Sequence, residues 1–114
     1  MKIVMLSPYF YPHTGGTEKY VRDLSVVLIQ QGQEVTVITN NLPRSKNAPA
    51  RETLPEGIKV IRLDAVDMFY YLPVSVQFNL KMLEGYDIVH AHVPAFSFLR
   101  SVAGKIKQPL IVTY

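Results

Sequence analysis

The sequence has no cysteine in its 114 residues, and it has no long apolar run. Without cysteine there is no disulfide framework, no thiol nucleophile and no cysteine-ligated metal site, which agrees with a reducing compartment. No run approaches the ~18 apolar residues of a membrane-spanning helix, and the apolar run at residues 3–6 is too short for a signal peptide. We therefore expect a soluble, cytoplasmic protein that can still contact a membrane surface.

A strong charge of either sign is also absent. Twelve basic residues against nine acidic ones give a net charge of +3, and hydrophobic residues make up 48% of the chain. This balance fits one globular domain with a buried core and gives no reason to expect a nucleic-acid partner. Arg100, Lys105 and Lys107 form a loose basic group. A solvated helix face is its ordinary explanation, and contact with an anionic membrane or substrate is the alternative.

Short apolar runs alternate with helical patterns along the chain. The runs predict strands, and apolar side chains at helical spacing predict helices between them. The expected strands are 3–6, 34–39, 58–63, 88–91 and 110–114; the expected helices are 17–31, which ends before Gly32, one within 72–83 that begins near Pro73, and 95–106. Residues 40–57 contain three prolines and several polar residues, so we expect a long loop there.

This alternation predicts an α/β fold with right-handed crossovers. We expect a Rossmann-like open parallel sheet in the strand order 3-2-1-4-5, with helices on both faces. The last strand, 110–114, feeds no further crossover. The domain is therefore expected to be incomplete at its carboxyl end, as the first part of something longer.

Gly15 and Gly16 stand between the first strand and the first helix. Ligands of open parallel sheets bind beyond the carboxyl ends of the strands. Glycine allows positive φ and close approach of a ligand, and the free N–H groups of a helix start favour an anion. A plain turn is the alternative. Glu18 would repel a phosphate beside it, so we expect it to face the loop or to accept hydrogen bonds from hydroxyls.

Two phosphate-binding fingerprints are missing. There is no G-x-G-x-x-G motif, and Asn40 stands where NAD sites usually carry an acid; there is no G-x-x-x-x-G-K-[ST] motif either. The stretch T-G-G-T-E at 14–18 is similar to the phosphate loop of flavodoxins, so an FMN-binding electron carrier is one alternative. Flavodoxins place that loop almost directly after the first strand, whereas residues 8–13 intervene here.

Three motifs occur in order: P-x-x-x-P-x-x-G-G-x-E at 8–18, D-I-V-H-A-H at 87–92, and L-I-V-T-Y at 110–114. With the first strand, this set resembles the opening of glycosyltransferase family 4, a retaining group with the GT-B fold, over essentially the whole chain. In that family two Rossmann-like domains face each other across a cleft. The first contributes mainly to the acceptor side, and the second binds the nucleotide-sugar donor.

The resemblance implies that residues 1–114 are a truncated N-terminal, acceptor-side domain that lacks its C-terminal donor domain. The parent reaction would move a sugar from a nucleotide sugar to a sugar or lipid acceptor with retention. No cofactor is expected, because the nucleotide sugar is a co-substrate, and no metal is expected to be essential. The chain alone is expected to be inactive.

The same resemblance places individual residues. Gly15 and Gly16 match a loop that approaches the donor's phosphate and sugar. Tyr9, Tyr11 and His13, with Phe10, would line the acceptor site or fold beneath the loop. No catalytic residue is assigned, because the family commonly carries a histidine just after V-T-Y, and that position lies beyond Tyr114.

His90 and His92 lie on one face of the fourth predicted strand, at its carboxyl end. A metal site would need a third ligand that the sequence does not indicate. We expect a core histidine at 90 and a cleft histidine at 92, where His92 would contact substrate. Some relatives carry an acid directly after this H-x-H, and Val93 stands there instead.

Two further functions stay open on the same fold. A stand-alone half of a two-subunit transferase would act as a binding module, and a GT-B sugar epimerase would act without an acceptor.

Overall fold

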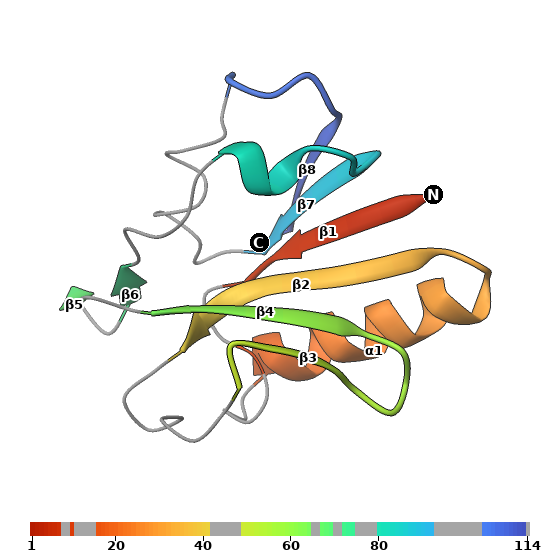
Figure 1. The fold of residues 1–114 in the computed structure, drawn as a ribbon, viewed down its shortest axis with the longest axis horizontal. Helices are drawn as coiled ribbons and strands as arrows, with labels where there is room; N and C mark the ends of the chain where they lie inside the picture. The colour runs from red at the N-terminus through yellow and green to blue at the C-terminus, as the bar shows by residue number, and fades with distance from the viewer. Residues whose placement is uncertain are drawn as a thin grey trace.

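A six-stranded sheet forms the centre of the computed structural model, in the order β3-β4-β2-β1-β7-β8 (Figure 1). The structure describes residues 1–7, 10, 16–41, 49–64, 67–69, 72–74, 80–92 and 104–113. The elements in these ranges are β1 (Lys2–Leu6), α1 (Gly16–Gln30), β2 (Glu34–Asn41), β3 (Arg51–Thr53), β4 (Lys59–Asp64), β5 (Asp67–Phe69), β6 (Leu72–Val74), the 3₁₀ helix η2 (Leu80–Leu83), β7 (Ile88–His92) and β8 (Leu110–Thr113).

The predicted parallel sheet is confirmed. The five expected strands correspond to β1, β2, β4, β7 and β8, they pair in parallel, and their order is the predicted 3-2-1-4-5. The structure adds β3, which pairs antiparallel with the outer edge of β4. The fold is therefore an α/β fold with a mainly parallel, Rossmann-like sheet.

The predicted loop at 40–57 is wrong in part. Asn40 and Asn41 still belong to β2, and Arg51–Thr53 form β3; residues 42–48 lie outside the described part of the chain. A tight turn joins β3 to β4, in which the Gly57 N–H donates to the Leu54 carbonyl and Gly57 has a φ of 98°. This turn folds the segment back on β4, which supplies the hydrogen bonds that a three-residue strand needs.

The helix predicted within 72–83 is also wrong in its first part. Pro73 lies in β6, opposite Met68 of β5, in a small antiparallel pair, where an edge position tolerates its missing N–H. Only η2 is helical among the described residues of that range. Most of the predicted helix at 95–106 lies outside the described residues, and its end, 104–106, begins with a turn in which Gly104 has a φ of 70°.

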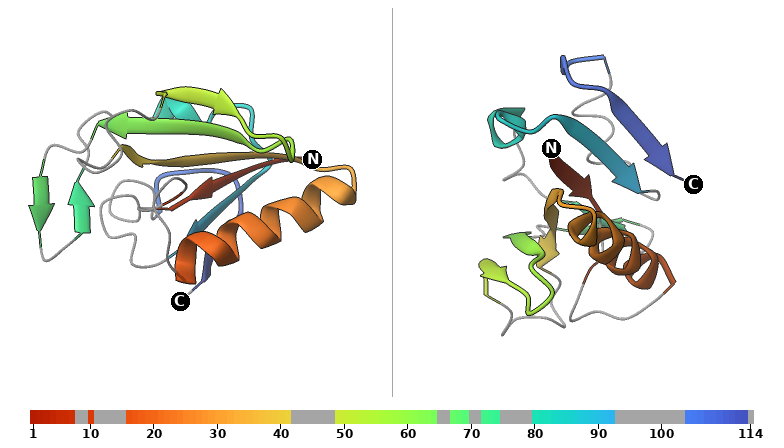
Figure 2. Two further views of the ribbon diagram at one scale, coloured as in Figure 1. Left: turned by 90° about the horizontal axis from the view of Figure 1, so that it is seen from below. Right: turned by 90° about the vertical axis from the view of Figure 1, so that its right-hand side faces the viewer.

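The central strand β1 separates two apolar cores. Ile3 and Met5 pack on the α1 side, whereas Val4 and Leu6 pack on the opposite side. Figure 2 shows α1 lying along one face of the sheet. On the other face, Leu83 of η2 joins the second core. Because both faces are covered, β1 is apolar at nearly every position, as the sequence predicted. The predicted helices on both faces of the sheet are therefore present: α1 covers one face and η2 packs on the other.

The carboxyl end of α1 is closed by a Schellman motif. The Gly32 N–H donates to the Ile29 carbonyl at 2.9 Å, and the Gln33 N–H donates to the Leu28 carbonyl at 3.0 Å. Gly32 has a φ of 88°, which is the left-handed conformation that this motif requires. The predicted stop at Gly32 is confirmed, and it turns the chain directly into β2.

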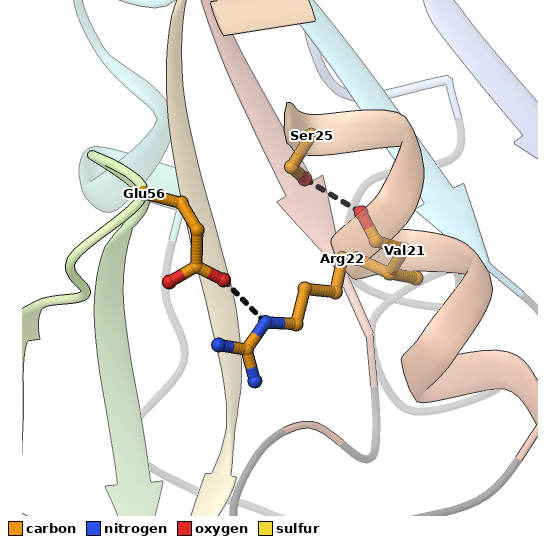
Figure 3. A network of polar contacts seen from close by, with 4 residues as sticks. All are labelled: Val21, Arg22, Ser25 and Glu56. Carbon is orange, nitrogen blue, oxygen red and sulfur yellow. Dashed lines mark hydrogen bonds and ion pairs between the residues drawn. The ribbon is translucent and has the colours of Figure 1, made fainter. Parts of the chain in front are cut away.

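An ion pair joins α1 to the β3–β4 turn (Figure 3). The Arg22 Nε lies 2.5 Å from a carboxylate oxygen of Glu56. On the buried side of the same helix, the Ser25 hydroxyl donates to the Val21 carbonyl at 2.7 Å, which satisfies a side chain with no exposed surface. Because Arg22 and Glu56 are partly exposed, their pair contributes little stability, at most about 1 kcal/mol.

Replacing Gly32 with alanine should lower the free energy of unfolding by about 1 kcal/mol, because an L side chain is unfavourable at positive φ. No atom lies within 4 Å of the Cβ position, so a steric clash would not contribute. Urea denaturation of the wild type and the variant measures the difference. Gly32→Asn is the control and should lose less, since asparagine tolerates this conformation. Equal stability of wild type and Gly32→Ala would contradict the left-handed assignment.

Candidate ligand-binding edge of the sheet

A row of polar side chains crosses the carboxyl edge of the sheet on the face that α1 covers. In the strand register, Thr39 pairs with Arg62, and His92 pairs with Thr113. Ser7 directly follows Leu6, whose partners are Ile38 of β2 and Ala91 of β7. Strand alternation puts all five polar residues on the side of Met5. Ser7, Thr39, Arg62 and His92 are each less than 5% exposed. This edge is where open parallel sheets bind ligands.

Arg62, at one end of the row, stabilises the neighbouring backbone. Its guanidinium donates to the Pro49 carbonyl at 2.9 Å and lies 2.7 Å from the Glu52 carboxylate. Its side chain is 1% exposed. A buried charge of this kind needs such partners, since removing one would leave the other uncompensated. Arg62 therefore ties β3 and the preceding segment to β4.

His90 and His92 form a stacked pair near the other end of the row. Their ring centroids lie 4.2 Å apart with an interplanar angle of 26°. The Tyr20 ring of α1 meets His92 edge-on at 5.8 Å. His90 Nε2 lies 2.5 Å from the Thr113 hydroxyl, which links β7 to the end of β8. The pair thus connects α1, β7 and β8.

His92 has one satisfied and one unsatisfied nitrogen. Its Nε2 lies 3.2 Å from the Met5 sulfur, whereas its Nδ1 is buried and has no hydrogen-bond partner among the described residues. The Thr39 hydroxyl, two strands away in the same row, is also buried and has no partner in the described part of the chain. Each such group costs about 1–3 kcal/mol in the absence of a partner, and unpaired buried groups often mark functional sites.

Both histidines are held in the neutral state. Burial, and to a smaller extent the neighbouring His90, together lower the pKa of His92 to about 4. Burial also lowers the pKa of His90. A second proton would place two positive rings in contact. At neutral pH the site therefore offers imidazole lone pairs and N–H groups rather than positive charge.

Three comparisons with known proteins agree with this geometry. The model of Glycosyltransferase Family 4 matches residues 14–114. The chain belongs to glycosyltransferase family 4. It is 35% identical over 77 residues to a phosphatidylinositol N-acetylglucosaminyltransferase subunit of Homo sapiens, and 31% identical over 103 residues to the phosphatidylinositol N-acetylglucosaminyltransferase GPI3 subunit of Saccharomyces cerevisiae. These alignments cover 68% and 84% of this chain.

Sucrose-phosphate synthase from Thermosynechococcus elongatus has a similar fold, with a TM-score of 0.63 and 20% identity over 99% of this chain. The family-4 chain spans only part of each similar protein: the alignments cover 13% of the human subunit, 22% of the yeast subunit and 32% of the synthase. No helix in the described part of the chain is long and apolar enough to cross a membrane.

The predicted glycine loop is described only at its end. Gly16 is the first residue of α1, so its backbone is helical. It does not adopt the positive φ that a glycine at this position could adopt. Glu18, in the first turn, is 7% exposed and is not a solvated residue. Gly15, Tyr9, Tyr11 and His13 lie outside the described residues. Their predicted contacts with substrate stay predictions.

Phe10 is 3% exposed and its side chain belongs to the core on the α1 side. His92 is 1% exposed, whereas His90 is only partly buried, and the expected division into a core histidine at 90 and a cleft histidine at 92 stays a prediction. The ring of His92 is in contact with Tyr20 of α1, Met5 of β1 and His90. Among the described residues, no three histidine or acidic side chains gather as a metal site would require.

Sequence reasoning missed Ser7, Thr39, Arg62 and Thr113. Only the strand register reveals that these four residues share one row. Their place at the ends of predicted strands was a signal in the sequence that could have indicated a site at this edge. A separate groove of about 380 Å³ lies across β3 and β4, with Arg51, Thr53, Lys59 and Tyr86 among its lining residues. It does not include the polar row, and the row is the better candidate because two of its buried polar atoms, the Thr39 hydroxyl and His92 Nδ1, lack hydrogen-bond partners within the described part of the chain.

Acidification should destabilise the family-4 chain through His92. The pKa of His92 is about 4 in the folded state and 6.5 in its ordinary state, so between these values the unfolded chain binds more protons and stability falls as pH falls. At one pKa unit per 1.36 kcal/mol, lowering the pH from 7.5 to 5 should cost up to about 2 kcal/mol. Urea denaturation at both pH values measures this loss.

His92→Asn is the control, because asparagine does not titrate and should remove most of the difference. The Arg22 hydrogen bond lowers the pKa of Glu56 from 4.5, so the contribution of Glu56 is lost below the pH range tested. If the variant lost as much stability as the wild type between pH 7.5 and 5, His92 would not be the responsible group.

Proposed function

We propose that the chain is the acceptor-side part of a glycosyltransferase that moves a sugar from a nucleotide-sugar donor to an acceptor, with retention of the anomeric configuration. The observation that carries the proposal is the family-4 match over residues 14–114. It is supported by the polar row at the carboxyl edge of the sheet, which ends on His92 and Thr113. The donor would be held by a second domain.

The relatives suggest particular substrates to test first. Two of them are named as phosphatidylinositol N-acetylglucosaminyltransferase subunits. Activated N-acetylglucosamine is therefore our first candidate donor, and an inositol phospholipid is our first candidate acceptor. Because both are called subunits, we also propose that the protein works with partner subunits. Lys105 and Lys107, both exposed, would favour contact with an anionic lipid surface.

We propose the same site residues that the resemblance implies. Gly15 and Gly16 would keep the wall of the cleft free of side chains, and the start of α1 would turn its N–H groups toward the ligand. His92 and Glu18 would lie near the substrate. We propose no cofactor and no essential metal, since helix dipoles and basic residues of the other domain would hold the diphosphate. The family match favours the transferase over an FMN-binding electron carrier.

The 114-residue chain alone should transfer no sugar. Positioning of reacting groups can supply roughly 7–11 kcal/mol of a barrier, and the proposed donor-binding domain is not part of this sequence. The purified chain and a longer protein that includes the donor domain are incubated with nucleotide-activated N-acetylglucosamine and phosphatidylinositol vesicles. Lipid-dependent nucleotide release by the longer protein alone is expected, with a product of the donor's anomeric configuration. Steady transfer by the 114-residue chain would show that the site was assigned to the wrong part of the protein.

Gly16→Val in the longer protein should abolish most transfer and leave the fold intact. Valine at the first residue of α1 would fill space that the ligand needs and crowd the first turn. Circular dichroism checks the fold, and initial rates measure the transfer. Gly16→Ala should retain more activity than Gly16→Val, and Thr53→Val, an exposed change on β3, should change nothing. A folded Gly16→Val variant with near-normal turnover would show that Gly16 is only a helix start.

A further inference from the structure

The His92 ring is fixed in place from three directions. His90 stacks on one face of the ring, with centroids 4.2 Å apart. Met5 of β1 places its sulfur 3.2 Å from Nε2, and Tyr20 of α1 packs edge-on at 5.8 Å. With contacts from a neighbouring strand, its own strand and a helix, the ring has little freedom to turn.

These contacts also determine where the ring carries its proton. A thioether sulfur can only accept a hydrogen bond, so the contact with Met5 favours an N–H at Nε2 of His92. In a neutral imidazole the other nitrogen, Nδ1, then carries a lone pair. That atom is buried and has no hydrogen-bond partner in the ranges that the structure describes. His92 is therefore a fixed hydrogen-bond acceptor that lacks its donor.

His90 is in turn held by β8. Its Nε2 lies 2.5 Å from the Thr113 hydroxyl at the end of that strand. This bond fixes the His90 ring, and the fixed ring supports the face of His92. Thr113 and His90 therefore act on the orientation of the His92 ring without forming a hydrogen bond to its Nδ1.

We propose that His92 Nδ1 accepts a hydrogen bond from a hydroxyl group of a neutral sugar or polyol ligand, and that His90, anchored by Thr113, is the positioning residue for this contact. This inference rests on the proposed function and names the ligand group that the site takes. Tyr20 packs edge-on against His92 and keeps 49% of its own surface exposed, so a movement of its side chain would open a path for the ligand to the ring. A side chain exposed to this degree changes rotamer rapidly.

A phosphate group does not fit this position. The lone pair on Nδ1 would repel anionic oxygens, and the described side chains in contact with the ring, Met5, Tyr20 and His90, bring no fixed positive charge. A hydroxyl donates to such a lone pair and needs no counter-charge. The hydroxyl can come from the donor sugar or from a polyol head group of the acceptor, and the experiment distinguishes these sources.

The test is nuclear magnetic resonance of the 114-residue chain labelled with ¹⁵N in histidine, at pH 7. Three probes are titrated in turn: myo-inositol, N-acetylglucosamine and inorganic phosphate. We expect His92 to be protonated at Nε2 and its Nδ1 resonance to shift saturably with at least one polyol. A response to myo-inositol assigns the subsite to the acceptor, and a response to N-acetylglucosamine assigns it to the donor sugar. Phosphate should leave Nδ1 unchanged.

Matched variants separate the acceptor atom from the packing. His92→Asn retains an acceptor near the Nδ1 position and should keep measurable polyol binding, whereas His92→Leu should weaken it at least tenfold. Thr113→Val should give a mixed His92 tautomer and weaker binding, and Thr113→Ser should restore both. Thr53→Val, on the exposed edge of the sheet, should change neither.

Several results would overturn the proposal. These are an Nδ1-protonated His92, a response to phosphate alone, no response to either polyol at saturating concentration, or an unchanged tautomer and affinity in Thr113→Val. None of these readouts depends on sugar transfer. If the longer protein transfers no sugar while the polyol shift persists, the proposed function fails and this subsite stands.

Discussion

The parallel pairing of β1 with strands on both of its edges is the constraint on which the rest of the structure depends. Lys2–Leu6 pair with β2 on one side and, from Ile3 onward, with β7 on the other. The same strand is buried on both faces by two separate cores. A slip of one residue would turn every side chain of β1 to the opposite face. The register is therefore strongly fixed, and with it the alignment of the carboxyl ends.

The polar row follows from that alignment. Ser7 takes its place from the end of β1, and Thr39 and His92 take theirs from the strands paired with it. Arg62 holds one end of the row through Pro49 and Glu52, and the other end depends on the bond between His90 and Thr113. The row is thus rigid at both ends, while between these ends the Thr39 hydroxyl and His92 Nδ1 have no partner among the residues that the structure describes. Such a rigid edge is suited to binding a ligand with several hydroxyl groups.

The sequence predicted the parts of the fold that apolar patterning determines. Residues 3–6 and 88–91 had to be covered on both faces, and Gly32 had to end a helix, because these signals are local. Arg51–Thr53 carry no strand pattern of their own, since β3 exists only because the Gly57 turn returns it to the edge of β4. Pro73 suggested a helix start, but its strand pairing with Met68 is a contact between neighbouring segments.

The candidate site could be predicted only in outline. Its location followed from Gly16 and from the place of His92 near a strand end. The contact of His92 with Tyr20, which lies 72 positions earlier, depends on the packing of α1 on the sheet. Thr39 and Arg62 lie in the same row as His92 because of the strand register. The register cannot be deduced from a local sequence pattern. The contact with Tyr20 and the strand register are both features of tertiary structure. They cannot be predicted from residues that are neighbours in the sequence.

The central claim is that substrate binds at the carboxyl edge of the sheet, on the side of α1. Photolabelling tests it most directly, with a phosphatidylinositol analogue that carries a diazirine on its inositol ring, followed by mass spectrometric mapping of the adducts. The account predicts adducts near Ser7, Tyr20 and His92, and their loss when unmodified phosphatidylinositol competes. Competable adducts concentrated instead on Thr53, Lys59 and Tyr86, in the separate groove across β3 and β4, would contradict it.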